Sequence, residues 1–386
     1  MVTGAYYPEI SSSGLQCQTV ARMVRNSASI EVLTTATDPR LPMRTLVDGV
    51  RVRRVVVDVS SRASKLRAMA VMVIRLMRSM PRVDLVHLHG FSTKNVVVSA
   101  AAKLFRRPVV LSLHTAGHDE PDAVRAQGPL AWWAYSSADL YLSVSPALVD
   151  AYLAAGLPAD RIRLVTNGID LDRFAPASPS ERCELRRRLR LPTERPLTLF
   201  VGFFSREKQP HVLLDAWLEL QRQPALESTL VFVGATRSKY FEVDADLEAD
   251  MRVAARVRGV EDRLVFAGQT LSVQDYFRAS DCFVLSSGRE GLPVALLEAM
   301  ACGLPCVASR LPGSTDVVID DGVNGLLVPP GDTASLAGAL AAVLGDDEQA
   351  RRLGRAARAT VEERFASGRV ADAWLDAYAT VLARSV

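Results

Sequence analysis

The sequence predicts an α/β protein with two tandem doubly wound domains, each built on a mostly parallel sheet. At 386 residues, the chain is too long for one ordinary domain and suits two domains of about 150–200 residues each. Short β-branched runs alternate with helix-length segments, and this series occurs twice. Several runs are apolar on both faces, as central strands of a covered parallel sheet are. We expect the two sheets to face a central cleft, because open α/β sheets bind ligands at the carboxyl ends of their strands.

The first series begins with a very short strand, since only Val2 and Thr3 precede the turn at Gly4. Further apolar, β-branched runs predict strands at 29–33, 50–57, 84–89, 108–114, 140–145 and 161–166. Between them, apolar residues at helical spacing predict helices at 15–25, 64–80, 93–104 and 146–155. This alternation is typical of right-handed crossovers between parallel strands.

The second series has the same alternation and follows a basic helix at 184–190. Its apolar runs predict strands at 197–202, 229–234, 264–268, 281–286, 305–309 and 325–328. Its helices are predicted at 211–221, 247–258, 293–301 and 333–344. The C-terminal segment predicts two more helices, separated by Phe365 and Ala366.

A linker divides the two series, because Asn167-Gly168 is turn chemistry and prolines follow at 176 and 179. We therefore expect an N-terminal domain at 1–175 and a C-terminal domain at 176–368, with a helix at 369–386 that crosses back to the first domain.

Composition excludes several classes of protein. Charged residues make up 23% and apolar residues 49%, which argues against a disordered chain. The apolar runs are far shorter than the ~18 residues that span a bilayer, and the N-terminus does not have the pattern of a signal peptide. We expect a cytoplasmic protein. The five cysteines form no Cys-x2-Cys pair beside histidines, which favours reduced thiols over a zinc site.

Charge is distributed unevenly along the chain. Residues 1–176 contain 21 basic and 14 acidic residues, whereas residues 177–386 contain 25 basic and 29 acidic residues. The first half is therefore expected to face an anionic partner. In the helix at 64–80 and just beyond it, four arginines fall within about 80° of arc at 100° per residue: Arg67, Arg75, Arg78 and Arg82.

Two interpretations of this basic helix stay open. It packs on its sheet with a basic, solvated outer face, or it contacts anionic lipid headgroups or a lipid-linked acceptor on the inner face of the cell membrane. In either case we expect the opposite side of the helix to pack inward, through Leu66, Met69, Val73, Leu76, Met77 and Met80.

The motifs that the sequence lacks exclude several classes of enzyme, and those that it contains indicate a ligand site. The chain contains no Gly-x-Gly-x-x-Gly after a strand, no Gly-x4-Gly-Lys-Ser/Thr and no Gly-x-Ser-x-Gly, which argues against a dinucleotide oxidoreductase, a P-loop enzyme and a serine hydrolase. The richest segment is 286–303, where a strand is followed by a glycine-containing loop with Glu290, by Pro293 at a helix start, and by Glu298 within the apolar helix. Buried carboxylates need partners, and polyol hydroxyls are suitable donors.

At these residues the sequence resembles glycosyltransferase family 4, the retaining nucleotide-sugar transferases whose B-type fold has two Rossmann-like domains. Glu290-Gly291-Leu292-Pro293 and Glu298-Ala299-Met300-Ala301-Cys302-Gly303 match the paired-glutamate signature of that family. Further matches follow in the family's order, at 84–89, 113–114, 165–170, 202–208 and 324–328.

The resemblance implies roles for individual residues. Glu298 would hold the ribose hydroxyls of the nucleotide, and Glu290 would contact the donor sugar with the backbone of Gly291 and Leu292. Lys208 would neutralise the diphosphate. Gly14 would let the backbone approach it, and His114 would lie near the transferred sugar. Pro293 would begin the helix whose N-terminus favours an anion.

Two positions depart from the family pattern. Phe203 stands where the family has an arginine, and Arg206 is the candidate to replace its charge on the phosphates. The early Gly-Gly of the family is replaced by serines at 11–13 before Gly14.

The histidines and two acidic pairs have plainer interpretations. We expect His87 and His89 to point to opposite faces of their strand, and His118 and His211 to lie at the surface. Asp170-x-Asp172 and Asp244-x-Asp246 are similar to the metal motif of A-type glycosyltransferases, but neither ends a convincing strand, so no metal ion is expected.

The sequence therefore predicts a metal-independent retaining hexosyltransferase without a cofactor. Its partners would be a UDP- or GDP-linked sugar and a hydroxyl acceptor, either a glycan, a glycolipid or a lipid-linked intermediate, and no nucleic acid. Two alternatives stay open: an epimerase or phosphorylase of the same fold, and a nucleotide-sugar-binding module without catalysis.

Overall fold

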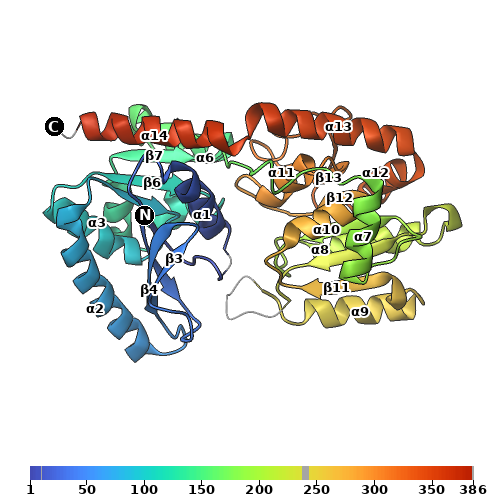
Figure 1. Ribbon diagram of the computed structural model, residues 1–386, viewed down its shortest axis with the longest axis horizontal. Coiled ribbons are helices and arrows are strands. Elements are labelled where there is room, and N and C mark those ends of the chain that lie inside the picture. The colour runs from blue at the N-terminus through green and yellow to red at the C-terminus, as the bar shows by residue number, and fades with distance from the viewer. Residues whose placement is uncertain (10, 237–242, 385–386) are drawn as a thin grey trace. The chain divides into compact units, whose positions relative to one another are not determined.

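The computed structural model describes residues 1–9, 11–236 and 243–384 (Figure 1). The chain divides into two compact units. Unit 1 comprises Met1–Gly168 together with Ser367–Val386, and unit 2 comprises Ile169–Ala366. Both are doubly wound α/β units with mostly parallel sheets, so the predicted fold class is confirmed.

Unit 1 is built on an eight-stranded sheet in the order β3-β4-β2-β1-β5-β6-β7-β8. The strands are β1 (Val2–Thr3), β2 (Glu31–Ala36), β3 (Arg44–Val47), β4 (Val50–Val56), β5 (Val86–His89), β6 (Val109–Leu113), β7 (Leu140–Ser143) and β8 (Ile162–Leu164). The helices are α1 (Ser12–Val24), α2 (Arg62–Ser79), α3 (Lys94–Leu104), α4 (Pro121–Arg125), α5 (Pro129–Ser136), α6 (Pro146–Ala154) and α14 (Ser367–Ala383), with short 3₁₀ turns η1 (Met80–Arg82) and η2 (Ala159–Arg161).

Among the described strands of this sheet, β3 alone runs antiparallel, and the sequence analysis missed it. It pairs with β4 through a tight hairpin in which Val47 lies opposite Val50. The two residues between them, Asp48 and Gly49, both have positive φ, as a type I′ turn in a two-residue hairpin requires. The Asp-Gly pair between two β-rich runs is a hairpin signal that could have revealed β3.

Unit 2 is built on a six-stranded parallel sheet in the order β11-β10-β9-β12-β13-β14. The strands are β9 (Leu197–Val201), β10 (Thr229–Val233), β11 (Leu264–Gly268), β12 (Cys282–Leu285), β13 (Cys306–Ser309) and β14 (Leu326–Val328). The helices are α7 (Pro179–Leu189), α8 (Pro210–Leu220), α9 (Leu247–Val257), α10 (Val273–Ala279), α11 (Val294–Ala301), α12 (Thr333–Gly345) and α13 (Asp347–Arg364), with 3₁₀ turns η3 (Pro224–Leu226) and η4 (Glu261–Arg263). Helices α7 and α8 begin at prolines, which are pre-organised for the first helical position.

Each sheet has a point at which the strand order reverses. In unit 1 this point lies between the neighbours β1 and β5, and in unit 2 it lies between β9 and β12. The loops that follow two such strands leave the sheet toward opposite faces, which opens a crevice at their carboxyl ends. These two points are where ligand sites are expected within each unit.

Helix α14 belongs to unit 1, although all of unit 2 precedes it in sequence. Its apolar face packs beside α1 and against strands β6 and β7. That face consists of Val370, Ala371, Trp374, Ala377, Tyr378 and Val381. Unit 2 begins at Ile169, whose backbone N–H donates to the carbonyl oxygen of Phe365 at 2.8 Å. The boundary therefore differs from the predicted 175/176, because this pairing joins residues 169–175 to unit 2.

A charged network attaches α7 to the sheet of unit 2. The Asp281 carboxylate accepts hydrogen bonds from Arg182, from Arg186 and from the backbone N–H of Leu197. The Arg186 side chain is only 8% exposed, and its Nε also donates to the carbonyl oxygen of Ala279. A buried guanidinium without a counter-charge costs free energy, and the Asp281 carboxylate provides the counter-charge for Arg186.

We predict that Asp281→Ala lowers the free energy of unfolding of unit 2 by about 3 kcal/mol, because Arg186 is left buried without a counter-charge. Urea unfolding followed by tryptophan fluorescence measures this loss. The control is Glu184→Ala on the same helix, which removes an exposed ion pair with Arg187 and should cost less than about 1 kcal/mol. Equal losses in the two variants would contradict the assignment.

Candidate functional site

In unit 2, the loops after β9 and β12 are held together by their own backbones. The Gly288 N–H donates to the carbonyl oxygen of Glu207 at 2.7 Å. The Ser286 hydroxyl lies 3.0 Å and 2.9 Å from the carbonyl oxygens of Lys208 and Gln209. The two loops thus form one rigid edge at the point where the strand order reverses.

An ion pair crosses the same two loops. The Lys208 Nζ donates to Glu290 Oε1 at 2.7 Å, and the Ser287 hydroxyl donates to the same oxygen at 2.7 Å. The Glu290 side chain is only 10% exposed, whereas that of Lys208 is 29% exposed. Two residues that are 82 positions apart, and that the sequence analysis assigned to phosphate and to sugar, are therefore in direct contact.

Glu298 lies within α11 as predicted. It is partly buried, and its carboxyl group forms no hydrogen bond or ion pair with any residue that the structure describes. Burial raises the pKa of Glu298 to about 8, although the charge of Arg173 opposes the shift. A carboxylate in this position is stabilised when a ligand supplies hydroxyl donors.

The segment between the two glutamates leads directly into α11. Gly291, Leu292 and Pro293 are buried, and Pro293 is the N-cap residue of the helix. The prediction that a helix starts here is confirmed. An eight-residue helix whose N-terminus follows Glu290 provides a partial positive charge beside the ion pair.

The structure gives Arg206 a partner other than a ligand. Its Nε donates to Asp244 Oδ2 at 2.9 Å, and its side chain is 65% exposed. Phe203 beside it is half-buried, whereas Phe204 is fully buried among the aromatic rings of the core of unit 2. Arg206 is free to reach a phosphate only if it leaves Asp244.

In unit 1, Gly14 has a packing role. It lies in the first turn of α1, and its N–H donates to the side chain of Ser11, the N-cap residue. A Cβ atom at this position would lie 2.2 Å from the carbonyl oxygen of Ala5. Only glycine lets α1 approach the end of β1 so closely.

His114 directly follows β6, whereas the predicted strand included it as its last residue, and it is one of three stacked histidines. Its ring lies 5.6 Å from that of His89, which in turn lies 4.4 Å from that of His87. Both ring nitrogens of His114 are buried and have no hydrogen-bond partner among the described residues. Burial lowers the pKa of His114 to about 4, so the imidazole is neutral at physiological pH.

The expectation that His87 and His89 point to opposite faces is wrong. Residues two apart on a strand share a face, and the two rings stack. His87 is a structural residue, hydrogen-bonded to Ser112 at 2.7 Å and to Tyr378 of α14 at 2.6 Å. His118 is exposed as expected, while His211 is half-buried at the start of α8.

Two charged residues near this edge of unit 1, the buried Asp119 and the half-buried Lys94, were missed by the sequence analysis. The Asp119 carboxylate accepts from the backbone N–H groups of Phe91, His114 and Thr115 at 2.7–2.9 Å, and so fixes the loops after β5 and β6. Lys94 begins α3, and its Nζ donates to the carbonyl oxygen of Thr3 at 2.8 Å. Burial lowers the pKa of Lys94 to about 8. Neither residue lies in a motif that marks such a role.

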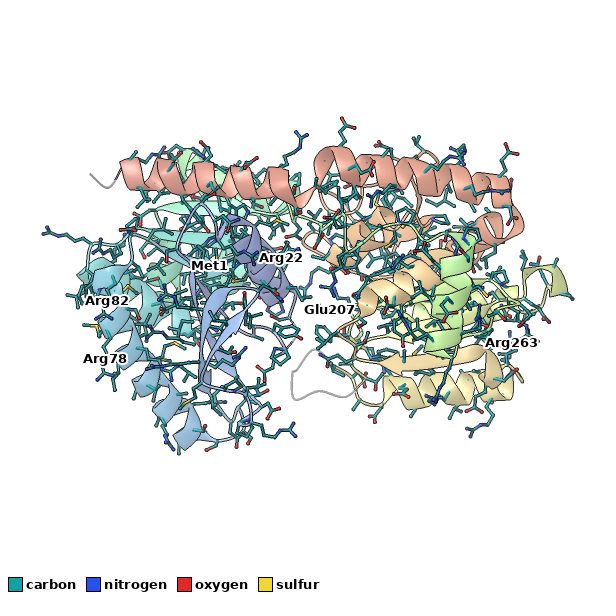
Figure 2. All side chains as sticks on the ribbon, viewed as in Figure 1. Met1, Arg22, Arg78, Arg82, Glu207 and Arg263 are labelled. Carbon is teal, nitrogen blue, oxygen red and sulfur yellow. The ribbon has the colours of Figure 1, made fainter. Side chains whose placement is uncertain are left out.

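The buried face of the basic helix α2 differs from the predicted one. Its buried residues are Ala68, Met72 and Leu76, spaced by four. Three residues expected to pack inward are exposed instead: Leu66 at 74%, Val73 at 37% and Met77 at 38%. Arg67, Arg78 and Arg82 are exposed, the last two labelled in Figure 2, but Arg75 is half-buried and faces the β3–β4 hairpin.

The Asp-x-Asp sequences have structural partners. Asp244 pairs with Arg206, and the Asp170 carboxylate accepts from the backbone N–H groups of Asp172 and Arg173. Within residues 1–9, 11–236 and 243–384, no cluster of three or more histidine, cysteine or acidic side chains is suited to hold a metal ion. None of the helices in these ranges is both long enough and apolar enough to cross a lipid bilayer.

Both halves of the chain match known families of glycosyltransferases. Residues 17–173 match the family described as Glycosyltransferase Family 4, and residues 181–360 match the family described as Glycosyl transferases group 1. The chain is 33% identical to the D-inositol 3-phosphate glycosyltransferase of Xylanimonas cellulosilytica, over 94% of this chain and 89% of the relative. The chain belongs to glycosyltransferase family 4. The corresponding protein of Saccharomonospora viridis is 32% identical to this glycosyltransferase, over 95% of this chain and 88% of the relative.

Solved structures share its B-type fold. The Anabaena protein HepE, in complex with UDP and glucose, has a TM-score of 0.79 at 22% identity, covering 98% of this glycosyltransferase and 99% of HepE. The sucrose-phosphate synthase of Thermosynechococcus elongatus has a TM-score of 0.81 at 22% identity, covering 99% of each chain.

We predict that Glu298→Gln stabilises this glycosyltransferase increasingly as the pH rises. Burial raises the pKa of Glu298 from 4.5 to about 8. Between these two pH values the folded chain therefore keeps a proton on Glu298 that the unfolded chain has lost. Wild-type stability therefore falls with rising pH, by up to about 1.4 kcal/mol per pH unit, and the glutamine variant lacks this loss. Urea unfolding at pH values of about 5 and 8 measures the difference. A difference that is the same at both pH values would contradict the prediction.

Proposed function

We propose that this glycosyltransferase moves a hexosyl unit from a UDP- or GDP-linked sugar to a hydroxyl acceptor, with retention of the anomeric configuration and without a metal ion. The observation that carries the proposal is the Lys208–Glu290 pair, followed in α11 by the carboxyl group of Glu298, which has no partner among the described residues. A nucleotide sugar has complementary groups for all three: a diphosphate for the cation, and sugar and ribose hydroxyls for the two carboxyl groups.

The electrostatics of the site suit the chemistry of transfer. When the bond between the sugar and the diphosphate breaks, negative charge grows on the leaving phosphate and positive charge on the sugar. Lys208 and the N-terminus of α11 stabilise the negative charge on the leaving phosphate. Because Glu290 contacts Lys208, a phosphate bound to Lys208 would bring its attached sugar close to Glu290. Fixed groups of this kind stabilise the transition state more than the ground state, because the charge they face develops during the reaction.

No enzyme nucleophile is required in this scheme. The acceptor hydroxyl attacks the face of the sugar from which the diphosphate departs, and the leaving phosphate takes the proton of that hydroxyl. The oxygen of the acceptor forms the new bond to the sugar as the bond to the phosphate oxygen breaks, so no covalent sugar–enzyme intermediate forms. His114 is neutral at physiological pH, so its imidazole offers one hydrogen-bond donor and one acceptor.

The acceptor is proposed to bind in unit 1, at the point between β1 and β5. The relatives named above act on D-inositol 3-phosphate, so a phosphorylated polyol is the first acceptor to test. Lys94 lies at this point, beside the end of β1, and supplies a cation for such a group. A glycan, a glycolipid or a lipid-linked acceptor is the other class, because the exposed arginines and apolar side chains of α2 suit a membrane surface.

A thermal-shift screen with UDP-, GDP- and ADP-linked sugars tests the donor assignment. A donor present at 100 times its dissociation constant should stabilise the fold by about 2.7 kcal/mol, which raises the unfolding temperature by a few degrees. The donor that stabilises most is then supplied with candidate acceptors, and the product is identified by mass spectrometry. Absence of stabilisation by every nucleotide sugar would contradict the proposed function.

We predict that Glu290→Ala lowers kcat by at least about 100-fold while the dissociation constant for the free nucleoside diphosphate changes little, because Glu290 contacts the sugar and the nucleotide is held elsewhere. Radiolabelled-sugar transfer and calorimetric nucleotide binding measure the two effects. The control is Glu207→Ala on the facing loop, which removes an ion pair with the exposed Arg289. Normal turnover by Glu290→Ala would show that the carboxylate has no part in transfer.

A further inference from the structure

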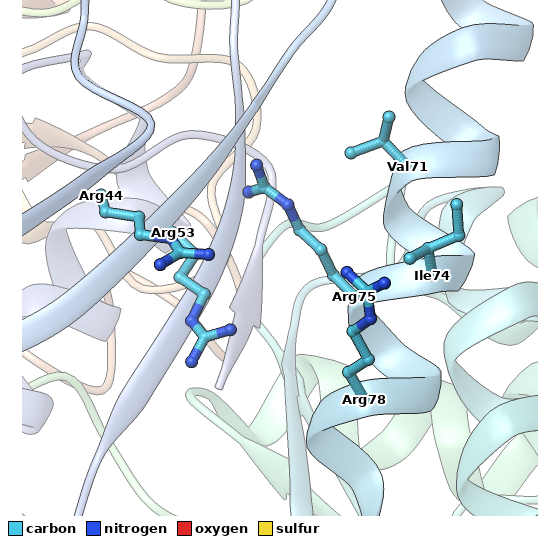
Figure 3. A pocket seen from close by; sticks show the side chains of 6 residues that line it. All are labelled: Arg44, Arg53, Val71, Ile74, Arg75 and Arg78. Atoms are coloured by element: carbon cyan, nitrogen blue, oxygen red, sulfur yellow. The ribbon is translucent and has the colours of Figure 1, made fainter.

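Unit 1 contains a pocket that the proposed function does not use. It lies between the β3–β4 hairpin and helix α2, and its volume is about 250 Å³. Figure 3 shows four arginine side chains that enter it from the two elements, Arg44 and Arg53 from the hairpin and Arg75 and Arg78 from α2. Val71 and Ile74 complete the wall. In the sheet, β4 is separated from β1 by β2, so the pocket is distinct from the point at which the acceptor is proposed to bind.

The positive charge in this pocket is largely uncompensated. Arg44 and Arg53 lie directly opposite each other in the antiparallel pair, an arrangement of like charges that destabilises a sheet. Arg53 is paired with Glu31, with Nε 2.9 Å from Oε1 and a terminal nitrogen 2.9 Å from Oε2. No carboxylate of the described residues pairs with the other three arginines, which leaves a net excess of positive charge.

Arg75 is fixed in position. One of its terminal nitrogens donates to the carbonyl oxygen of Arg54 at 2.7 Å. Burial lowers the pKa of Arg75, and the charges of Arg44 and Arg53 add to the shift. The guanidinium is thus held by the backbone of β4 in the field of two like charges, and an anion would relieve that repulsion.

The size and lining of the pocket define its ligand. The pocket is smaller than the sites that enclose drug-sized molecules, which are about 300–1,000 Å³. Guanidinium groups bind phosphate oxygens in a bidentate manner, and several guanidinium groups together favour a group with more than one negative charge. Val71 and Ile74 add an apolar wall beside the arginines, which suits the organic side of an ester.

We propose that the pocket formed by Arg44, Arg53, Arg75 and Arg78 binds a phosphate monoester or diphosphate group at a site separate from the donor site in unit 2. The group belongs either to a free phosphorylated molecule or to the headgroup of an anionic lipid. Its recognition depends on the convergence of the hairpin with α2, and the total positive charge of the helix is not sufficient for it.

Two double variants with the same change in net charge test this proposal on the full chain. Arg44→Gln/Arg78→Gln removes two exposed pocket arginines whose side chains form no hydrogen bond with any described residue, so its unfolding temperature should equal or slightly exceed that of the wild type. Arg67→Gln/Arg82→Gln removes two arginines of α2 and η1 that do not line the pocket. Binding is measured by calorimetry with inorganic pyrophosphate and by co-sedimentation with phosphatidylcholine vesicles containing or lacking phosphatidic acid.

The pocket variant should lose at least tenfold in affinity for one of the two probes, and the outer variant should lose no more than about twofold. Loss with pyrophosphate alone identifies a free phosphorylated ligand, and loss with phosphatidic acid vesicles identifies a lipid headgroup. The proposal is overturned if the wild type binds neither probe, if the pocket variant binds both as the wild type does, or if the two variants lose affinity equally. The last result would indicate a diffuse basic surface.

Discussion

The Lys208–Glu290 ion pair is the interaction on which the functional interpretation depends. The chain brings these two residues together because β9 and β12 are neighbours in the sheet and the loops that follow them are hydrogen-bonded to each other. The contact is 2.7 Å, and the carboxylate is nearly buried. Without a ligand, the two groups neutralise each other, so neither is left as an uncompensated buried charge. A ligand that separates them has to offer an anion to one and hydrogen-bond donors to the other, and this dual requirement is what restricts the choice of ligand.

Buried polar groups in the two units fall into two kinds. Asp281 and Asp119 each accept three hydrogen bonds, from arginines and backbone N–H groups or from backbone N–H groups alone, and their role is to hold elements of the fold. The buried imidazole of His114 and the half-buried carboxyl group of Glu298 form no hydrogen bond within the described residues. Because an unpaired buried polar group costs free energy, the second kind indicates where a ligand completes the structure. Both kinds include carboxyl groups, so the presence of a carboxyl group does not by itself distinguish them.

The sequence predicted those features that depend on local pattern. Period and apolar content were sufficient for nearly all strands of both sheets, and the strand–loop–helix context singled out Glu290 and Glu298. What it missed depends on contacts between distant segments. The role of Asp119 requires two loops to meet, and the inward face of α2, with Ala68, Met72 and Leu76, depends on how the helix packs on α3 and β4. Strand β3 is an exception, because the Asp48-Gly49 turn was visible in the sequence.

Helix α14 has a consequence for how the protein is made. During synthesis on the ribosome, unit 2 leaves the exit tunnel complete, whereas unit 1 still lacks the helix that covers β6 and β7. Until α14 arrives, apolar side chains such as Val110 and Leu142 are exposed on the nascent chain. Newly made unit 1 therefore keeps this apolar surface uncovered for the whole time that unit 2 is being translated, and a premature stop in that stretch leaves it uncovered in the product, where it favours aggregation.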